Sequence, residues 1–384
     1  MSPVAESAII TFGIFFAGLF SVHFALSSAV LEIVLGVFLG NALGLSPQPW
    51  LQFLAGIGGV MLTFLAGAEV SPDFIRQEWR ACLLLGLVCF FSPFLTAAAY
   101  CVYVLGWDTR AALIAGCVAS CTSLAIVYAV LVERGLRSTR LGKILMGATF
   151  VTNMGTIVAL AVTVMDITDH TLIVLVGSAL LVIFGPRLLA PFFVRYKGYV
   201  IEPEIKLLFA LLLLFMVMDQ WGSVNPVLPA FLFGVSLAST FREHPDLHRK
   251  LRIVAFSMLT PFFAVYAGLR CELSVLAEHW PTVVMLLLLK LASKGIPILP
   301  LARRYANSHA MYFTLILTSS LTMGLISATH GLREGYLNST QYSILVLVVI
   351  GAAIIPTFIA QRWFEPELSD EDKEELLAES EEAI

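Results

Sequence analysis

Residues 111–132 read AALIAGCVASCTSLAIVYAVLV, and residues 309–331 read HAMYFTLILTSSLTMGLISATHG. Each stretch is long and apolar enough to cross a bilayer as a helix. Each also carries a polar cluster at its centre, SCTS at residues 120–123 and TSSLT at residues 318–322. One such cluster often only bonds back to its own helix or bridges to a neighbour. The occurrence of two predicts a pair of interrupted membrane helices.

The rest of the chain has the composition of a membrane protein. Of its 384 residues, 59% are hydrophobic and 13% are charged, whereas a soluble domain is about a quarter charged. This excludes a soluble globular protein, a nucleic-acid binder and a secreted disulfide scaffold. The apolar runs are unbroken over about 20 residues, which fits helices and not the alternating strands of a barrel. The fold class predicted is therefore an all-α membrane protein.

Hydropathy and helix breakers predict thirteen transmembrane helices. Their approximate ranges are 7–26, 29–45, 50–70, 80–105, 110–132, 141–165, 171–194, 205–221, 224–241, 252–271, 280–301, 309–331 and 339–362. The two polar clusters lie seven spans apart, so their helices run in opposite directions. This predicts inverted repeats, with spans 2–6 related to spans 9–13 and an ion site where the two broken helices cross.

The basic residues predict the orientation. With the N-terminus outside, 18 of the 23 lysines and arginines lie in inside loops, 3 lie outside, and Lys290 and Lys294 lie within a span. This bias follows the positive-inside rule and predicts a multi-pass cell (inner) membrane protein with a cytoplasmic C-terminus. Residues 1–364 form the predicted membrane domain, with core helices at about 80–165 and 280–362. Residues 365–384 carry ten acidic residues and form a predicted cytoplasmic tail.

Two lysines stand out because a charge at bilayer depth costs at least about 2.5–3.5 kcal/mol. Lys290 and Lys294 occur in LLLLKLASKGIPILPLA, residues 286–302, and their spacing places both on one helix face. The following Gly295, Pro297 and Pro300 predict a broken or kinked helix. Lys294 is the stronger candidate for function, and snorkelling to the interface is the alternative for both lysines.

Further polar residues are candidates for an ion site or pathway. Thr152 and Asn153 form the strongly polar pair at the centre of the sixth span, where the alternative role for Asn153 is an interhelical hydrogen bond. Glu32 lies a few residues into its helix and could face a cytoplasmic funnel. Glu69 lies near an inside end, which favours an interfacial role.

The order and spacing of several segments resemble the cation/proton antiporter superfamily, the bacterial sodium/proton antiporters of the thirteen-span type. These segments are LEIVLGVFLG at 31–40, TFLAGAE at 63–69, TSLAIVYAVLVERG at 122–135, GATFVTNMGT at 147–156, FFAVYAGLRCELS at 262–274 and SKG at 293–295. The resemblance implies crossing broken helices at the fifth and twelfth spans, a mobile core and a homodimer. It also implies two mid-membrane acidic residues on the sixth span, of which the second binds a cation or protons, and a lysine paired with the first.

The chain departs from that pattern at the ion site. Thr152 and Asn153 fall on the two acidic positions and Lys294 on the lysine, so the ion-carrying aspartate is replaced by an amide. Ser320 and Thr322 stand where an arginine and a glutamate are often found. An amide cannot release a proton near neutral pH. Lys294 then lacks its usual partner in apolar surroundings, and we hypothesise that it could itself carry a proton.

The function predicted is secondary exchange of Na⁺, Li⁺ or K⁺ for protons by alternating access, with coupling impaired by Asn153. The predicted ion-binding residues are Thr122, Ser123, Thr152, Asn153 and Lys294, with a possible pathway through Glu32, Glu69, Ser320 and Thr322. The expected partners are monovalent cations, protons and the lipid bilayer, without nucleic acid or cofactor. The alternatives are a proton-independent ion or anion permease on the same fold and a non-transporting membrane sensor. An enzyme is not expected, because the sequence has no catalytic or metal-spaced cluster near a membrane face.

Overall fold

The computed structural model describes residues 3–24, 27–69, 78–124, 126–127, 131, 139–164, 171–196, 199, 201–222, 226–306 and 309–364. Every regular element within these ranges is a helix, which confirms the predicted fold class. In the described ranges, nine helices are long and apolar enough to cross a membrane, and two shorter apolar helices span Ser28–Leu43 and Thr109–Ser120. The acidic tail predicted at 365–384 lies outside the described residues.

The chain divides into two compact units. Unit 1 comprises Met1–Val70 and Ala161–Val275, and unit 2 comprises Ser71–Leu160 and Leu276–Ile384. Each unit is therefore assembled from two separate stretches of the chain, and each is described by itself below.

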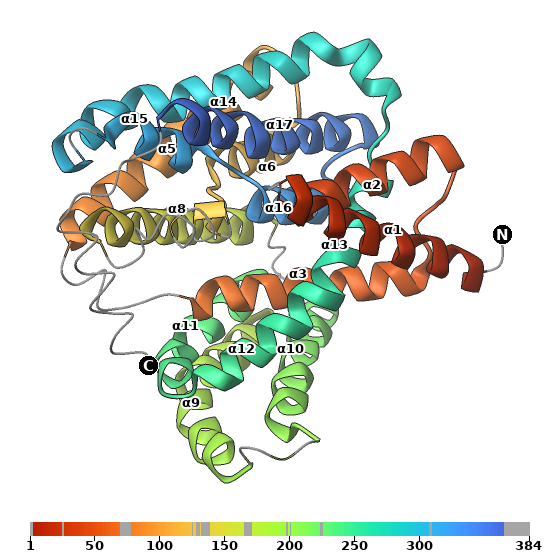
Figure 1. Cartoon of the computed structure of the whole chain (residues 1–384), viewed down its shortest axis with the longest axis vertical. Helices are drawn as coiled ribbons and strands as arrows, with labels where there is room; N and C mark the ends of the chain where they lie inside the picture. The colour runs from red at the N-terminus through yellow and green to blue at the C-terminus, as the bar shows by residue number, and fades with distance from the viewer. Residues whose placement is uncertain are drawn as a thin grey trace. The chain divides into compact units, whose positions relative to one another are not determined.

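Unit 1 is a bundle of close-packed helices (Figure 1). Its elements are α1 (Pro3–Phe24), α2 (Ser28–Leu43), α3 (Pro49–Ala68), α9 (Thr171–Tyr196), α10 (Pro203–Gly222), α11 (Val227–Glu243), α12 (Pro245–Val254), the π-helix η1 (Ala255–Leu259) and α13 (Thr260–Leu269). Helices α3 and α11 approach most closely at Gly67 and Gly234, where an added Cβ would overlap the carbonyl oxygens of Phe231 and Phe64 respectively. Small residues at helix crossings allow this backbone contact, as is common in membrane proteins.

The predicted start of the tenth span at residue 252 is wrong. Helix α12 begins at Pro245 and continues through η1 into α13 without leaving helical geometry. Its first two turns are polar and basic, so hydropathy does not detect them, but Leu247 and Leu251 are buried on one face. Burial of that face explains why the helix starts before the apolar run does.

Unit 2 contains the two lysines and both polar clusters. Its elements are α5 (Trp79–Tyr103), α6 (Thr109–Ser120), α8 (Arg140–Val164), α14 (Ser274–Ala306), α15 (Ala310–Thr318), α16 (Thr322–Arg333) and α17 (Ser339–Trp363). Helix α17 packs against both α15 and α16, and α16 packs against α6 (Figure 1).

The sequence predicts a broken or kinked helix at Gly295, Pro297 and Pro300, and of these two alternatives the break is wrong. Helix α14 runs from Ser274 to Ala306, and its one residue with non-helical backbone angles is His279. Pro297 lacks an N–H group and so leaves the carbonyl of Ser293 without its helical donor. The hydroxyl of Ser92 on α5 donates to that carbonyl oxygen. A neighbouring helix thereby satisfies the freed group, and the helix continues through the proline.

Candidate functional site

Helix α6 ends in the middle of its apolar run. Asp108 begins the helix by accepting from the backbone N–H of Arg110, and the last helical residue is Ser120. The next residue, Cys121, has φ −58° and ψ 151°, which is an extended conformation. The carbonyls of the last turn therefore have no helical donors ahead of them and need other partners.

The second interrupted helix shows the same feature at the matching polar cluster. Helix α15 ends at Thr318, Ser319 is extended with φ −63° and ψ 141°, and α16 begins at Thr322. Residues 121–123 and 319–321 are thus the two non-helical segments. Both predicted interruptions are confirmed.

The two interruptions lie against each other inside unit 2. The backbone N–H of Ser123 donates to the carbonyl of Ser319 at 3.0 Å. The Cys121 Sγ lies 2.8 Å from the Ser320 Oγ. The Thr122 hydroxyl donates to the carbonyl of Leu317 at 3.2 Å. The fold prediction required this meeting of two broken helices, which is therefore confirmed.

Lys294 from α14 reaches the interruption of α6. Its Nζ donates to the carbonyl oxygens of Ser120 and Cys121 at 2.7 and 2.8 Å, and to the Thr122 Oγ1 at 2.8 Å. The lysine has no solvent exposure. An ammonium has three N–H donors, and these three oxygens satisfy all of them.

Lys290 lies one turn earlier on α14 and is equally buried. Its Nζ donates to the carbonyls of Val118 and Ala119 at 2.9 and 3.1 Å. Snorkelling to the interface, the alternative considered from sequence, is therefore wrong for Lys290. The i, i+4 spacing was the signal that could have placed Lys290 beside Lys294 at the same helix end.

The two lysines together complete the C-terminal end of α6. Consecutive carbonyls from residue 118 to residue 121 each accept from an ammonium of α14. The C-terminus of a helix carries partial negative charge, which favours cations. The described contacts of both ammonium groups are with neutral oxygens, so the helix end itself stabilises the charge.

Of the two polar residues on the sixth predicted span, Asn153 contacts the interruption of α6 and Thr152 does not. The Oδ1 of Asn153, which is almost fully buried, accepts from the backbone N–H of Thr122 at 3.3 Å. The Thr152 hydroxyl instead bonds to the carbonyls of Ala148 on its own helix and Gly86 on α5. Thr152 joins α8 to α5, and its hydroxyl makes no described contact with Lys294.

The remaining predicted residues are placed as follows. Ser123 contributes its backbone and Ser320 its hydroxyl to the meeting of the two interruptions, and Thr322 is the first residue of α16. Glu32 and Glu69 belong to unit 1. Glu32 is buried on α2. Glu69 follows the last residue of α3, and its Oε1 lies 3.7 Å from the Arg252 Nε.

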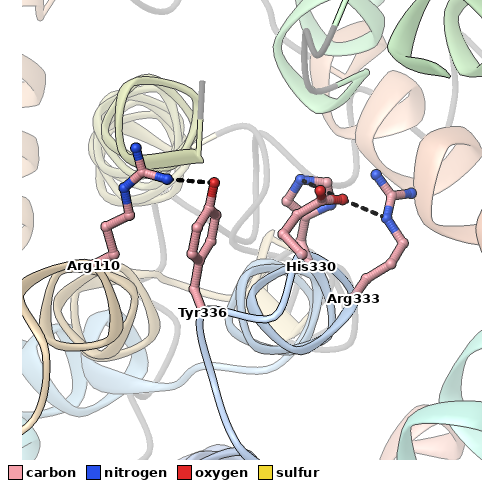
Figure 2. A network of polar contacts seen from close by, with 5 residues as sticks. Arg110, His330, Arg333 and Tyr336 are labelled. Carbon is pink, nitrogen blue, oxygen red and sulfur yellow. Dashed lines mark hydrogen bonds and ion pairs between the residues drawn. The ribbon is translucent and has the colours of Figure 1, made fainter. Parts of the chain in front are cut away.

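A second polar network, which sequence analysis missed, lies at the other end of α6 and α16. Figure 2 shows Arg110 at the start of α6 pointing toward Tyr336, which follows α16. The Arg110 Nη1 donates to the Tyr336 hydroxyl at 2.6 Å. Arg333 donates to Glu334 at 2.8 Å, and the His330 Nε2 lies 3.9 Å from the same carboxylate oxygen. The Arg110–Tyr336 contact ties the start of α6 to the loop after α16, and the other two contacts lie at the end of α16 itself.

Two interrupted apolar helices meet inside unit 2, and the Lys294 ammonium lies on three oxygens at that point. This arrangement is typical of an ion transporter. Residues 9–365 match the family described as sodium/hydrogen exchanger, transmembrane, and the chain belongs to this family. Its members are transporters, which agrees with the prediction that the chain is not an enzyme.

The chain is also similar to individual members. It is 24% identical over 374 residues to the Na(+)/H(+) antiporter NhaS4 of Synechocystis sp., covering 88% of this chain and 91% of that protein. It is 25% identical over 355 residues to the probable Na(+)/H(+) antiporter 3 of Methanocaldococcus jannaschii, covering 88% and 90%. The structure of the sodium proton antiporter MjNhaP1 from the same archaeon has the same fold, with a TM-score of 0.71, 13% identity and coverage of 94% and 97%.

Proposed function

We propose that the protein exchanges a monovalent cation for protons by alternating access, with the interruption of α6 as its ion site. One observation carries the proposal: a fully buried lysine ammonium sits on three oxygens at the end of a broken membrane helix. An ammonium is itself a monovalent cation. The oxygens that hold it are therefore already arranged to bind one.

Proton coupling follows from competition for these oxygens. While Lys294 is protonated, its ammonium occupies the carbonyls of Ser120 and Cys121 and the hydroxyl of Thr122. When Lys294 releases its proton, the neutral amine keeps only two N–H groups and no charge, so its hold on the three oxygens weakens and a metal ion can compete for them once the side chain turns away. Buried polar groups are costly to leave unsatisfied, so either the proton or the cation must be present. One group thus binds the two ions in turn.

Asn153 modifies this exchange. Its amide oxygen lies next to the site through Thr122, but it brings no negative charge. A carboxylate there would hold a cation more strongly. We therefore expect coupled exchange to be weak in this chain and to rise when an aspartate replaces Asn153.

The anion permease considered from sequence is less favoured by the same contacts. All three N–H groups of Lys294 are directed at protein oxygens, so no donor of this lysine is left for an anion. The negative end of α6 would also repel one.

The wider setting is part of the proposal. We infer that unit 2 carries the ion and unit 1 is the scaffold, in a homodimer of the cell membrane with the N-terminus outside. The distribution of basic residues supports the orientation. The resemblance to sodium/proton antiporters supports the dimer and the division of roles.

Lys294→Arg tests the proposal. A guanidinium keeps its proton at every accessible pH, so we expect cation-dependent proton flux in proteoliposomes to fall by about tenfold or more. A pH-sensitive dye inside the vesicles measures the flux. Lys143→Arg on α8 is the control, because it makes the same exchange at a partly exposed position.

A second variant covers the case in which arginine does not fit. Lys294→Gln retains hydrogen-bond donors but cannot titrate, and we expect it to lose proton coupling while remaining folded. If either folded variant keeps the flux and pH profile of the original chain, Lys294 does not carry the proton.

A further inference from the structure

We propose that one end of unit 2 is a docking surface for the headgroups of anionic phospholipids. The surface is formed by the first turns of α5 and α8 and by the last turn of α14. It includes no residue of the proposed ion site, and the inference stands whether or not the protein exchanges cations. The exposed basic residues of the surface are Arg80, Arg140, Arg303 and Arg304, and Lys143 is partly exposed.

Contacts of Arg140, the first residue of α8, bring the three helix ends together. Its Nε and Nη2 donate to the two carboxylate oxygens of Glu78, the residue before α5, at 2.5 and 3.2 Å. The same guanidinium lies close enough to Tyr305, in the last turn of α14, to interact with it electrostatically. The basic residues of the three helices therefore gather at one end of unit 2.

This surface carries more positive than negative charge. Within the described part of the chain, Glu78 is the only acidic residue at these three helix ends, and Arg140 already binds it. One carboxylate cannot neutralise the five basic residues around it. A guanidinium binds two oxygens of a phosphate at once, and an anionic phospholipid presents such oxygens at the membrane surface. Charge and donor geometry thus fit the same partner.

The surface lies at the end of a lipid-facing stripe on α5. Leu83, Leu87 and Phe91 are exposed, and their spacing places them on one face of the helix. Arg80 continues that face at the helix start, and its guanidinium lies 5.3 Å from the ring centroid of Trp79, which is half exposed. Tryptophan is enriched at the boundary between hydrocarbon and water. This places Arg80 at the level of the lipid headgroups.

Helix α14 shows the same pattern in the opposite chain direction. Leu288 and Ile296 are exposed, and Arg303 lies on the same face two turns after Ile296. Two lipid-facing stripes therefore end in arginines at the same end of the unit. Basic residues clustered beside the end of a membrane helix attract anionic lipids. Both helices thus carry their apolar face into the bilayer and their arginines to its headgroups.

Displacement of a quenching lipid from Trp79 tests the inference. The full chain is placed in bilayers of brominated phosphatidylcholine, which quenches tryptophan fluorescence, and phosphatidylglycerol is added in increasing proportion. The signal of Trp79 is the difference between the original chain and Trp79→Phe. We expect phosphatidylglycerol to bind beside Trp79 more tightly than phosphatidylcholine, and Arg80→Gln or Arg303→Gln to reduce this preference about fivefold each.

Arg195→Gln is the matched control, because Arg195 is also exposed and lies over an aromatic ring, that of Tyr196, but belongs to α9 of unit 1. It should leave the preference unchanged, and an equal fall would overturn the inference by showing a general attraction to surface charge. Equal affinities for the two lipids in the original chain overturn it without any variant. A preference undiminished by high salt also overturns it, since salt screens exposed charges.

Discussion

The two interrupted helices end in the same way but satisfy their last carbonyls differently. At the end of α6, carbonyls 118–121 accept from the ammonium groups of Lys290 and Lys294. At the end of α15, the carbonyl of Leu315 accepts from the Thr318 hydroxyl and that of Ile316 from the Ser319 hydroxyl, each at 2.7 Å. Lysines of another helix contact four carbonyls at the end of α6. At the end of α15, two carbonyls accept from hydroxyls of the same segment, and that of Leu317 accepts from the neutral Thr122 hydroxyl.

The difference between the two helix ends supports the proposal that the ion site lies at the end of α6. Hydroxyls that bond back to their own helix are fixed parts of it and cannot be exchanged for an ion. An ammonium on a neighbouring helix can lose a proton, and with it one N–H donor and its charge, so its hold on these carbonyls can weaken. The proposed function therefore predicts that the contacts at the end of α6 change during exchange and that those at the end of α15 do not.

The Thr122 side chain contacts both Lys294 at the end of α6 and Leu317 at the end of α15. Its removal should have the largest effect on stability and exchange. Its hydroxyl accepts from Lys294 and donates to Leu317. Thr122→Val keeps the shape but leaves a buried donor and a buried acceptor unsatisfied, each costing about 1–3 kcal/mol. We expect a loss of about 2–5 kcal/mol in the free energy of unfolding, measured by denaturation in detergent, together with loss of exchange.

Thr318→Val is the comparison for this experiment. The Thr318 hydroxyl bonds only within its own helix among the described contacts, so its removal should cost about 1 kcal/mol. Equal losses of unfolding free energy for Thr122→Val and Thr318→Val would show that the ends of α6 and α15 are equivalent.

The two helix interruptions could be predicted from sequence because each is a polar cluster inside an apolar run. Polar clusters such as SCTS and TSSLT are conspicuous within apolar runs, and a buried lysine is costly enough to suggest a role for Lys294. Which oxygens Lys294 would meet was beyond the sequence, since the carbonyls of Ser120 and Cys121 look like any others until the backbone path is known.

Two other residues show how far contacts with distant helices matter. Pro297 predicts a broken helix when only its own chain is considered, and the helix continues because Ser92, 201 positions away, satisfies Ser293. The resemblance places Thr152 at the first acidic position of the ion site, and that role stays a prediction; adjacent helical residues point in different directions. Its hydroxyl consequently faces Gly86. Contacts between distant helices decided both cases.

Close packing around the α6 interruption gives the next prediction. A Cβ added at Gly324 on α16 would lie 2.9 Å from both the Cys121 Sγ and the Val349 Cγ2. Gly324→Ala should therefore force the interruption to shift and lower the free energy of unfolding by about 1–3 kcal/mol. Because the carbonyl of Cys121 accepts a hydrogen bond from Lys294, we also expect slower cation/proton exchange in proteoliposomes.

Gly295→Ala provides the opposite case on the helix of the lysines. The atoms nearest to its added Cβ are methyl groups of Thr314 and Thr318 at 3.7 and 3.9 Å, so the methyl fits. An alanine in a helix interior is favoured over glycine by about 0.5–1 kcal/mol, and we expect that much stabilisation. Destabilisation by Gly295→Ala as large as that by Gly324→Ala would show that the tight fit is not specific to the α6 interruption.

The smallest effect is expected where charges remain at the surface. Glu78 accepts two hydrogen bonds from the Arg140 guanidinium, which holds the pKa of the carboxyl below its ordinary value. A group with a lowered folded pKa stabilises the protein fully above its unfolded pKa of about 4.3 and loses that contribution as the pH falls through the folded value. Since Arg140 is largely exposed, the contribution should be within about 1 kcal/mol.

Thermal unfolding of the original chain and of Glu78→Gln between neutral and acidic pH measures that contribution. The midpoint of the original chain should be slightly higher at neutral pH, and the two midpoints should converge as the pH falls below the ordinary range of a carboxyl. High salt should shrink the difference, because exposed charges are screened. The difference between the Thr122→Val and Thr318→Val variants should persist in high salt, since it arises from buried groups. A salt-dependent difference there would mean that the end of α6 is open to solvent ions, contrary to its burial in the structure.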